Sequence, residues 1–363
     1  MTQRDKTVPA FVFDIDGVLV KGRKPVPGAR ETIQLLQRLG IPFIFLTNGG
    51  GHTEAAHVAK LAMRIDVQLD AQQFVQSHTP FYDLVPKYED ETVLVLGGSG
   101  QQIRELAQAY GFRKVVTSSD LLAQFPHIHP FPEMTGAHHA EHARINDLTR
   151  VSGTRIAAIL VWTSPRDWCL DLQVVMDLLL SEGGVLGTRS RHNGDTTREN
   201  KGYQTDGQPP LFFCNPDFEW STEHTQPRFA QGAFREALKG VWQSATGGAD
   251  LEYSVVGKPT EATYIYGERT LREYADKVLP EDHKIGTAYM IGDNPQSDII
   301  GSNSFVSRAG ITWKSVLVET GVYVAGTTPS APPFHTARNV KEAIEWALER
   351  EGVDTDATPQ STE

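Results

Sequence analysis

Two aspartates, Asp14 and Asp16, stand one residue apart directly after the apolar run Phe11-Val12-Phe13. The run is typical of a buried strand, so both carboxylates are expected at its carboxyl end. Two like charges this close resist ionising together unless a cation or a proton lies between them. The pair alone is explained equally well by an Mg²⁺ site with a nucleophilic aspartate and by a strand that runs into a solvated acidic turn.

Polar residues follow three later apolar runs in the same manner. They are Thr47-Asn48-Gly49 after residues 42–46, Lys258 after residues 253–256, and Asp293 with Asp298 after residues 288–291. Each motif alone has a simpler explanation: a turn, a solvated lysine or a helix cap. Because the carboxyl ends of parallel strands lie at one edge of a sheet, the four motifs together predict one site equipped for phosphoryl transfer.

In order and residue type, the four motifs resemble those of the haloacid dehalogenase superfamily. The matching segments are residues 13–17, 46–48, 257–259 and 292–298. Four ordered motifs are far more specific than any one of them, and the similarity covers most of the chain outside a middle insertion. The resemblance implies a Rossmann-like α/β core with a parallel sheet. It also implies an Mg²⁺-dependent phosphatase that hydrolyses a small phosphomonoester through an aspartyl-phosphate intermediate.

The resemblance assigns catalytic roles to three residues. Asp14 would be the nucleophile that attacks phosphorus, a route open to a carboxylate when a cation offsets the repulsion between anions. Asp16 would protonate the leaving oxygen and later activate water, a role that requires a raised pKa. Lys258 would neutralise the nucleophile and the phosphate.

Two sets of binding groups follow from the same resemblance. Phosphoryl oxygens would be bound by Thr47, by the backbone N–H groups of Asn48 and Gly49, and by Lys258. The cofactor Mg²⁺ would be held by the carboxylates of Asp14 and Asp293 and by the main-chain carbonyl of Asp16, with Asp298 in support.

The elements that must position these residues alternate between strand and helix. A helix at residues 29–39, with Ile33 and Leu36 on one face, separates the first strand from the strand at residues 42–46. Such a strand–helix–strand unit requires parallel strands. The strand expected at residues 92–96 continues the alternation of strand and helix, and we expect it in the same sheet.

The long interval between Thr47 and Lys258 leaves room for an inserted domain. This arrangement resembles class IIA of the superfamily, which includes NagD-like proteins and nitrophenylphosphatases, in which an α/β cap of the C2 type closes over the site. The expected boundaries place the core at residues 1–97 and 215–354, the cap at residues 98–214 and a disordered tail at residues 355–363.

Three segments look closer to one branch of that class. Residues 14–20, 292–298 and 313–323 are similar to the branch of the cat eye syndrome critical region protein. Members of that branch are generally assigned to mitochondria. We therefore expect an intracellular protein, mitochondrial by this resemblance and otherwise cytoplasmic, and leave open whether a transit peptide has been removed.

Composition excludes several classes of protein. A chain of 363 residues has room for about two domains. Its composition, 39% hydrophobic and 22% charged residues, excludes a wholly disordered chain. A net charge of −11 argues against a nucleic-acid binder. No apolar run approaches the roughly 20 residues that span a bilayer. The 2 cysteines suit a reducing compartment.

The sequence says less about the substrate. Four residues are candidates for contact with the rest of a small phosphorylated metabolite. They are Arg189, Arg191 and His192 in a polar loop, and Asn215 at an expected hinge. A solvated basic loop explains the loop residues at least as well. We interpret the histidine-rich segment at residues 127–142 as polar surface.

Two alternatives to a phosphatase remain. A phosphomutase uses the same core but typically carries a small helical cap. A non-catalytic binding or scaffolding protein could retain the fold, although it would have no need of Asp16. Capped relatives often pair, so a homodimer is expected by analogy only.

Overall fold

The computed structural model describes residues 6–144, 153–220, 224, 226 and 228–355. The chain divides into two compact units. The first, here called the core unit, comprises Met1–Gly49, Thr53–Ser77 and Gly257–Glu363. The second, the cap unit, comprises Gly50–His52 and His78–Val256.

A six-stranded sheet forms the centre of the core unit. Its order is β15-β14-β13-β1-β4-β5, and every neighbouring pair is parallel. The strands are β1 (Lys6–Phe13), β4 (Phe43–Leu46), β5 (Phe74–Val75), β13 (His283–Gly292), β14 (Thr312–Val318) and β15 (His335–Ala337). The carboxyl ends of β13, β1 and β4 therefore lie next to one another, as the βαβ pattern predicts.

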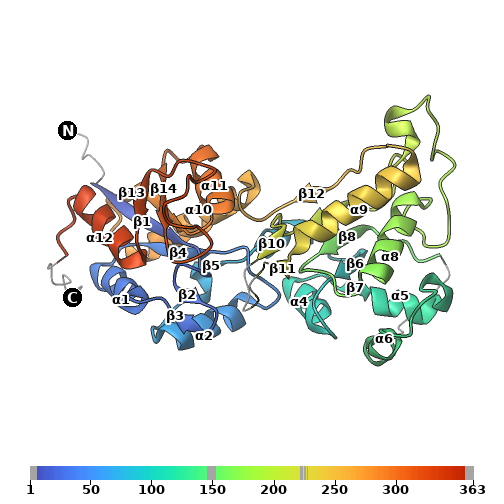
Figure 1. Cartoon of the computed structure of the whole chain (residues 1–363), viewed down its shortest axis with the longest axis horizontal. Coiled ribbons are helices and arrows are strands. Elements are labelled where there is room, and N and C mark those ends of the chain that lie inside the picture. Colours follow the sequence, from blue (N-terminus) through green and yellow to red (C-terminus); the bar gives the residue numbers. More distant parts are fainter. Residues whose placement is uncertain (1–5, 145–152, 221–223, 225, 227, 356–363) are drawn as a thin grey trace. The chain divides into compact units, whose positions relative to one another are not determined.

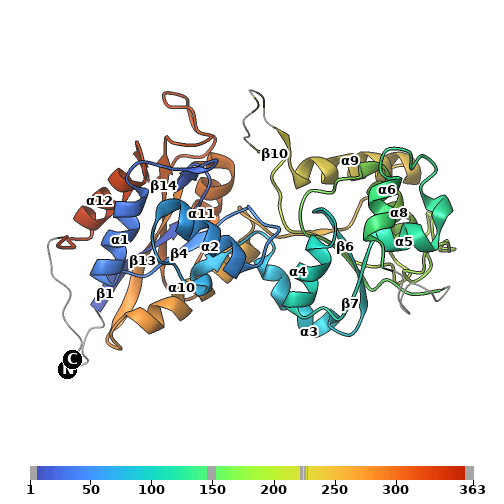
Figure 2. The ribbon, with the colours of Figure 1, turned by 90° about the horizontal axis from the view of Figure 1, so that it is seen from below.

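Alternate side chains of β1 cover the two faces of this sheet. Phe11 and Phe13 pack in a cluster with apolar residues of three helices, α1 (Ala29–Leu39), α2 (Glu54–Ile65) and α12 (Val340–Arg350). Ala10 and Val12 pack on the opposite face with α10 (Glu261–Val278). Figures 1 and 2 show the sheet between these helices. Burial on both faces explains why β1 reads as a continuous apolar run.

A second parallel sheet, of five strands, forms the cap unit. Its order is β12-β9-β8-β6-β7. The strands are β6 (Thr92–Leu96), β7 (Lys114–Thr117), β8 (Ala158–Val161), β9 (Leu211–Phe213) and β12 (Ser254–Val255). The helices of this unit are α3 (Val85–Tyr88), α4 (Gln102–Tyr110), α5 (Ser118–Gln124), α6 (Gly136–His142), α8 (Trp168–Leu180) and α9 (Gln231–Thr246).

Short elements complete the two units. The antiparallel pairs are β2 (Val20–Lys21) with β3 (Lys24–Pro25), and β10 (Glu219–Trp220) with β11 (Arg228–Phe229). Between β13 and β14 the chain forms a π-helical turn (Pro295–Ile299) and α11 (Ile300–Ser304). The remaining short helices are Ala71–Gln73, Thr79–Leu84, Pro126–Ile128 and Glu199–Gly202. No helix in the described ranges is long and apolar enough to cross a membrane.

The units divide at different places from those expected. The strand β6 was expected in the core sheet but pairs with β7 and β8 in the cap sheet. At the other boundary, α9 packs Phe234 and Trp242 into the cap core, and β12 joins the cap sheet. Strands and helices alternate in the same way on both sides of each boundary between the units. No local sequence pattern therefore marks where the chain passes from one sheet to the other. The expected tail lies, beyond Thr355, outside the described residues.

The histidine-rich segment is not simply polar surface. His129 and His139 are 3% and 7% exposed, and the Nε2 atoms of both lie within 3.3 Å of Asp167 Oδ2. Thr135 donates to the same oxygen at 2.6 Å. Asp167 is also the N-cap of α8, so these contacts fasten the segment to the start of that helix.

Candidate active site

Three of the predicted motifs follow neighbouring core strands. Asp14 directly follows β1, Thr47 follows β4, and Asp293 follows β13. All three side chains are buried. Lys258 is also buried in the core unit, but it does not follow a core strand as expected. The strand before it, β12, belongs to the cap sheet, and Lys258 lies just before α10.

The ammonium group of Lys258 joins two carboxylates. Its Nζ donates to Asp14 Oδ1 at 2.8 Å and to Asp298 Oδ1 at 2.6 Å. Burial disfavours the charged lysine, but the attraction of Asp14 and Asp298 outweighs burial and raises the pKa of Lys258 above its usual range. The lysine therefore stays charged and offsets part of the negative charge around it.

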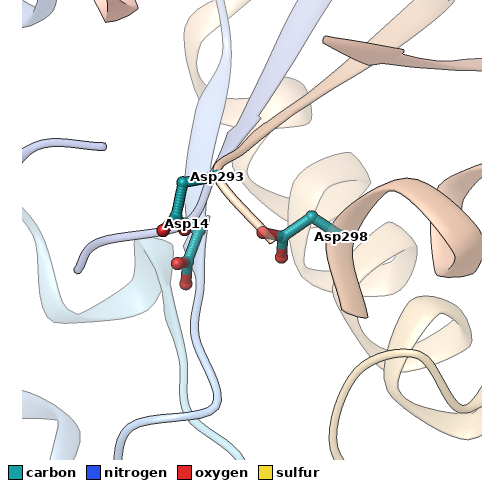
Figure 3. Close-up of side chains that lie close together, drawn as sticks. All are labelled: Asp14, Asp293 and Asp298. Carbon is teal, nitrogen blue, oxygen red and sulfur yellow. The ribbon is translucent and has the colours of Figure 1, made fainter. Parts of the chain in front are cut away.

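Three carboxylates gather beside this ammonium. Asp14, Asp293 and Asp298 each offer an oxygen within 4.8 Å of the others, and Figure 3 shows their side chains close together. Burial, followed by the charges of Asp14 and Asp298, raises the pKa of Asp293 well above its usual range. One lysine cannot balance three carboxylates. Their hard oxygens and excess negative charge fit a divalent cation such as Mg²⁺.

Both carboxylate oxygens of Asp298 already accept a hydrogen bond. Its Oδ1 accepts from Lys258, and its Oδ2 accepts from the backbone N–H of Asn294 at 3.1 Å. Burial raises its pKa to about 6 in spite of the contact with Lys258. The hydroxyl of Tyr264 donates to the main-chain carbonyl of Asp298 at 3.0 Å. This geometry suits the supporting position expected for Asp298.

The loop after β4 places the phosphate-binding candidates beside Lys258. The Asn48 side chain donates to the Lys258 carbonyl at 2.8 Å and accepts from the Lys258 N–H at 2.7 Å. Asn48 thereby links the second motif to the third. The Gly49 N–H, expected to face a phosphoryl oxygen, instead donates to Thr47 Oγ1 at 3.0 Å. The Thr47 hydroxyl, the Asn48 N–H and the Lys258 ammonium group stay candidates for contact with phosphoryl oxygens.

Asp16 lies in a tight turn after β1 and is exposed, unlike Asp14. The turn is closed by the Gly17 N–H, which donates to the Val20 carbonyl at 2.7 Å. Although the Asp16 carboxylate reaches solvent, desolvation by the surrounding protein, followed by the charge of Asp14, raises its pKa to about 6. Its side chain is outside the carboxylate cluster.

The four substrate-side candidates are not brought together. Arg189, Arg191 and His192 lie in a cap loop packed against the carboxyl end of α8, where Ser190 N donates to the Leu180 carbonyl at 3.0 Å. Asn215 follows β9 near the start of α9, and its N–H donates to Gln231 Oε1 at 2.9 Å. Because α8 runs back along the sheet after β8, these places lie at opposite ends of the cap sheet.

Several site contacts were missed by sequence reasoning. They are the side-chain bonds of Asn48, the Tyr264 hydroxyl beneath Asp298, and the Val322 N–H, which donates to Asp293 Oδ2 at 2.7 Å. The segment at residues 313–323 was singled out by resemblance alone. A backbone N–H donor requires no particular residue type, so the sequence does not reveal it. Within that segment only Gly321 indicated a close approach of the backbone to another group.

Comparison with known proteins identifies the family. Residues 11–113 match a family model described as haloacid dehalogenase-like hydrolase, and residues 255–343 match a second described as HAD-hydrolase-like. The chain is 33% identical over 361 residues to a mitochondrial hydrolase of Saccharomyces cerevisiae, a match that covers 94% of this chain and 96% of the relative. This chain therefore belongs to the haloacid dehalogenase-like hydrolases, and it is a hydrolase of class IIA.

Two further proteins support the family and the fold. A cardiolipin synthase (CMP-forming)/mitochondrial hydrolase fusion protein of Schizosaccharomyces pombe is 37% identical over 343 residues. That match covers 94% of this chain, which spans about half, 53%, of the fusion protein. The structure of p-nitrophenyl phosphatase from Archaeoglobus fulgidus has a TM-score of 0.60 and 16% identity, and the match covers 94% of this chain and 99% of that one.

Proposed function

We propose that this chain is an Mg²⁺-dependent phosphatase that hydrolyses a small phosphomonoester. The observation that carries the proposal is the buried contact of Lys258 Nζ with Asp14 at 2.8 Å, beside Asp293 and Asp298. Asp14 is a carboxylate at the end of a strand, held by an ammonium group among further buried carboxylates. Such a carboxylate suits a nucleophilic attack on an anionic phosphoryl group. When bound by Asp14 and Asp293, with the Asp16 carbonyl, Mg²⁺ supplies positive charge that reduces the repulsion between nucleophile and substrate.

In the first step Asp14 acts as the nucleophile. One of its carboxylate oxygens forms a bond to phosphorus, and the bond between phosphorus and the leaving oxygen breaks. Asp16 gives its proton to that oxygen, so the alcohol leaves neutral. Thr47, the Asn48 N–H and Lys258 would stabilise the charge on the other phosphoryl oxygens. The products of this step are the alcohol and an aspartyl phosphate on Asp14.

In the second step water releases the phosphate. Asp16, now a carboxylate, takes a proton from a water molecule as its oxygen attacks phosphorus. The bond between phosphorus and Asp14 breaks and restores the free carboxylate. Inorganic phosphate leaves, and Asp16 is again protonated for the next cycle. The raised pKa of Asp16, to about 6, agrees with a group that alternates between the two forms.

The names of similar proteins suggest where to search for the substrate. The fission yeast relative joins a hydrolase to a cardiolipin synthase that forms CMP, and CMP is itself a phosphomonoester. A phosphatase that consumed this product would draw the synthase reaction forward. We therefore place CMP among the first candidate substrates. Both yeast relatives are named as mitochondrial, which supports a mitochondrial location for this chain.

The proposal is tested by release of inorganic phosphate from a panel of substrates. The panel contains p-nitrophenyl phosphate, CMP, other nucleoside monophosphates, glycerol phosphates and sugar phosphates, each with Mg²⁺ and with EDTA. We expect Mg²⁺-dependent release by the wild type and a loss on the order of a thousandfold or more in Asp14→Asn. Conversion of a sugar phosphate to its isomer without phosphate release would favour the phosphomutase. No reaction across the panel would favour the scaffolding protein. The expected homodimer remains a prediction, which light scattering can check.

A further inference from the structure

The loop that follows β14 holds Asp293 by its backbone. The Val322 N–H donates to Asp293 Oδ2 at 2.7 Å, and the Tyr323 N–H donates to the Asp293 carbonyl at 3.2 Å. Asp293 is 3% exposed, so water has little access to replace these donors. A carboxylate oxygen that accepts a backbone hydrogen bond is fixed in direction. The loop thus fixes the direction of Oδ2 and, with it, the orientation of the whole carboxylate.

Two glycines allow the backbone to approach this carboxylate closely. A Cβ atom added at Gly321 would lie 1.7 Å from Asp293 Oδ2, and one added at Gly17 would lie 2.4 Å from the same oxygen. Gly17 also has a φ of +85°, which L side chains rarely adopt. Gly321 has no such conformational need, so its close approach to Asp293 is what requires a glycine there. The carboxylate is enclosed between two stretches of main chain.

The same loop is fastened to the turn that carries Asp16. The Thr320 hydroxyl donates to the Gly17 carbonyl, and Lys21 Nζ donates to the Thr320 carbonyl at 3.3 Å. Residues 319–323 therefore contact both the turn after β1 and the first residue after β13. These two turns supply the groups expected to hold the cation, and the loop bonds to both of them.

We propose that residues 319–323 form a cradle that orients Asp293 for the divalent cation. In this cradle Gly321 and Thr320 are positioning residues that act through Asp293 and Gly17. The inference rests on the cation site of the proposed function. Outer groups that orient a metal ligand typically change metal affinity by about 10–100-fold when altered. The contacts described above join the cradle to Asp293, Gly17 and Lys21 and to no phosphate-binding candidate, so substrate binding should respond less than cation binding.

The test measures Mg²⁺ binding directly, by titration calorimetry without substrate. In Gly321→Ala the new methyl group must displace Asp293, and we expect Mg²⁺ to bind at least about tenfold more weakly. The matched control is Gly240→Ala, since a Cβ atom there meets nothing within 4 Å. Its Mg²⁺ affinity should equal that of the wild type. Equal affinity in Gly321→Ala, with the fold intact by circular dichroism, would overturn the proposal.

A second pair of variants keeps the proposal open to refutation if Gly321→Ala does not fold. Thr320→Val removes the hydroxyl at nearly constant volume, and Thr320→Ser retains it. We expect weaker Mg²⁺ binding in Thr320→Val, by about threefold or more, and recovery in Thr320→Ser. The same affinity in both variants would refute the role of the loop.

Substrate kinetics separate this inference from the proposed function. At saturating Mg²⁺ the KM for substrate should stay within about twofold of the wild type in Thr320→Val, while the Mg²⁺ concentration for half-maximal rate rises. If the wild type binds Mg²⁺ but hydrolyses nothing, the phosphatase proposal fails and the calorimetric comparison still decides the role of the cradle. A rise in substrate KM with unchanged Mg²⁺ binding would count against the cradle.

Discussion

At the scale of single residues, one ammonium group holds the candidate site together, because Lys258 Nζ donates to Asp14 Oδ1 at 2.8 Å and to Asp298 Oδ1 at 2.6 Å. Asp14, Lys258 and Asp293 were predicted to lie together, and the structure brings them together in the core unit. For Asp14 and Asp293 the reason is general, because parallel strands deliver their carboxyl ends to one edge of the sheet, whereas Lys258 reaches them from the segment before α10. The reciprocal bonds of Asn48 with Lys258 could not be predicted, since both groups come from loops whose paths depend on the folded structure.

Replacement of Lys258 should be costly for both stability and activity. In Lys258→Met the carboxylates of Asp14 and Asp298 stay buried without their counter-charge. We expect a loss of roughly 3–5 kcal/mol in the free energy of unfolding, measured by urea denaturation. Hydrolysis should fall by on the order of a hundredfold or more. The control is Lys239→Met, which breaks an exposed pair with Glu236 and should cost less than about 1 kcal/mol. Equal costs for the two variants would contradict the role given to Lys258.

Asp16 should matter most when the leaving group is a poor one. An alkoxide needs a proton to leave, whereas p-nitrophenolate leaves readily without one. In Asp16→Asn we therefore expect glycerol phosphate hydrolysis to fall at least about tenfold more than p-nitrophenyl phosphate hydrolysis, compared as kcat/KM. An equal fall for both substrates would argue against general acid catalysis by Asp16.

At the scale of helices and strands, most elements were predictable but their grouping was not. Apolar runs such as residues 92–96 gave strands because their side chains are buried on both faces. The sheet that β6 joins depends on which strands pair with it, and no residue within β6 indicates which sheet that is. The burial of His129 and His139 was missed for a similar reason, because their partner Asp167 lies far along the chain.

Asp171 in α8 should make the stability of the cap unit depend on pH. Burial raises its pKa to about 7, although the Ser118 hydroxyl donates to it. Between roughly pH 4 and 7 the folded state binds a proton that the unfolded state lacks, so stability falls as pH rises through this window. Asp171→Asn should remove that loss and add roughly 2–4 kcal/mol at pH 8, since one pKa unit is about 1.4 kcal/mol.

The check is urea denaturation of the full chain at pH 5 and pH 8, followed by tryptophan fluorescence. The control is Asp276→Asn, an exposed position on α10 whose change should leave the pH dependence as in the wild type. If Asp171→Asn and the wild type show the same difference between the two pH values, Asp171 is ionised in the folded protein and the assignment is wrong.

At the scale of the whole molecule, the chain is two α/β units with separate cores. Phe11 and Phe13 belong to one core, and Phe234 and Trp242 to another. The predicted catalytic, phosphate-binding and metal residues of the four motifs all fall in the core unit. The motifs that predict the reaction class therefore lie in one unit, and they carry no prediction of the substrate.

Mg²⁺ should therefore stabilise one unit selectively. A ligand that binds only the folded state at 100 times its Kd adds about 2.7 kcal/mol. In a calorimetric scan we expect Mg²⁺ to raise the melting temperature of the core unit and to leave that of the cap unit unchanged. Asp293→Asn should remove the shift. An equal shift in both transitions, or a shift that persists in Asp293→Asn, would contradict a cation site at the three carboxylates.

In the proposed reaction Asp14 carries the phosphoryl group between the two steps. The most direct measurement is acid quenching of the enzyme within a single turnover of ³²P-labelled substrate, followed by peptide mapping of the protein-bound label. We predict a label on the peptide that contains Asp14, formed only with Mg²⁺ and absent from Asp14→Asn. Turnover by the wild type without any labelled protein, or a label on another residue, would rule out Asp14 as the nucleophile.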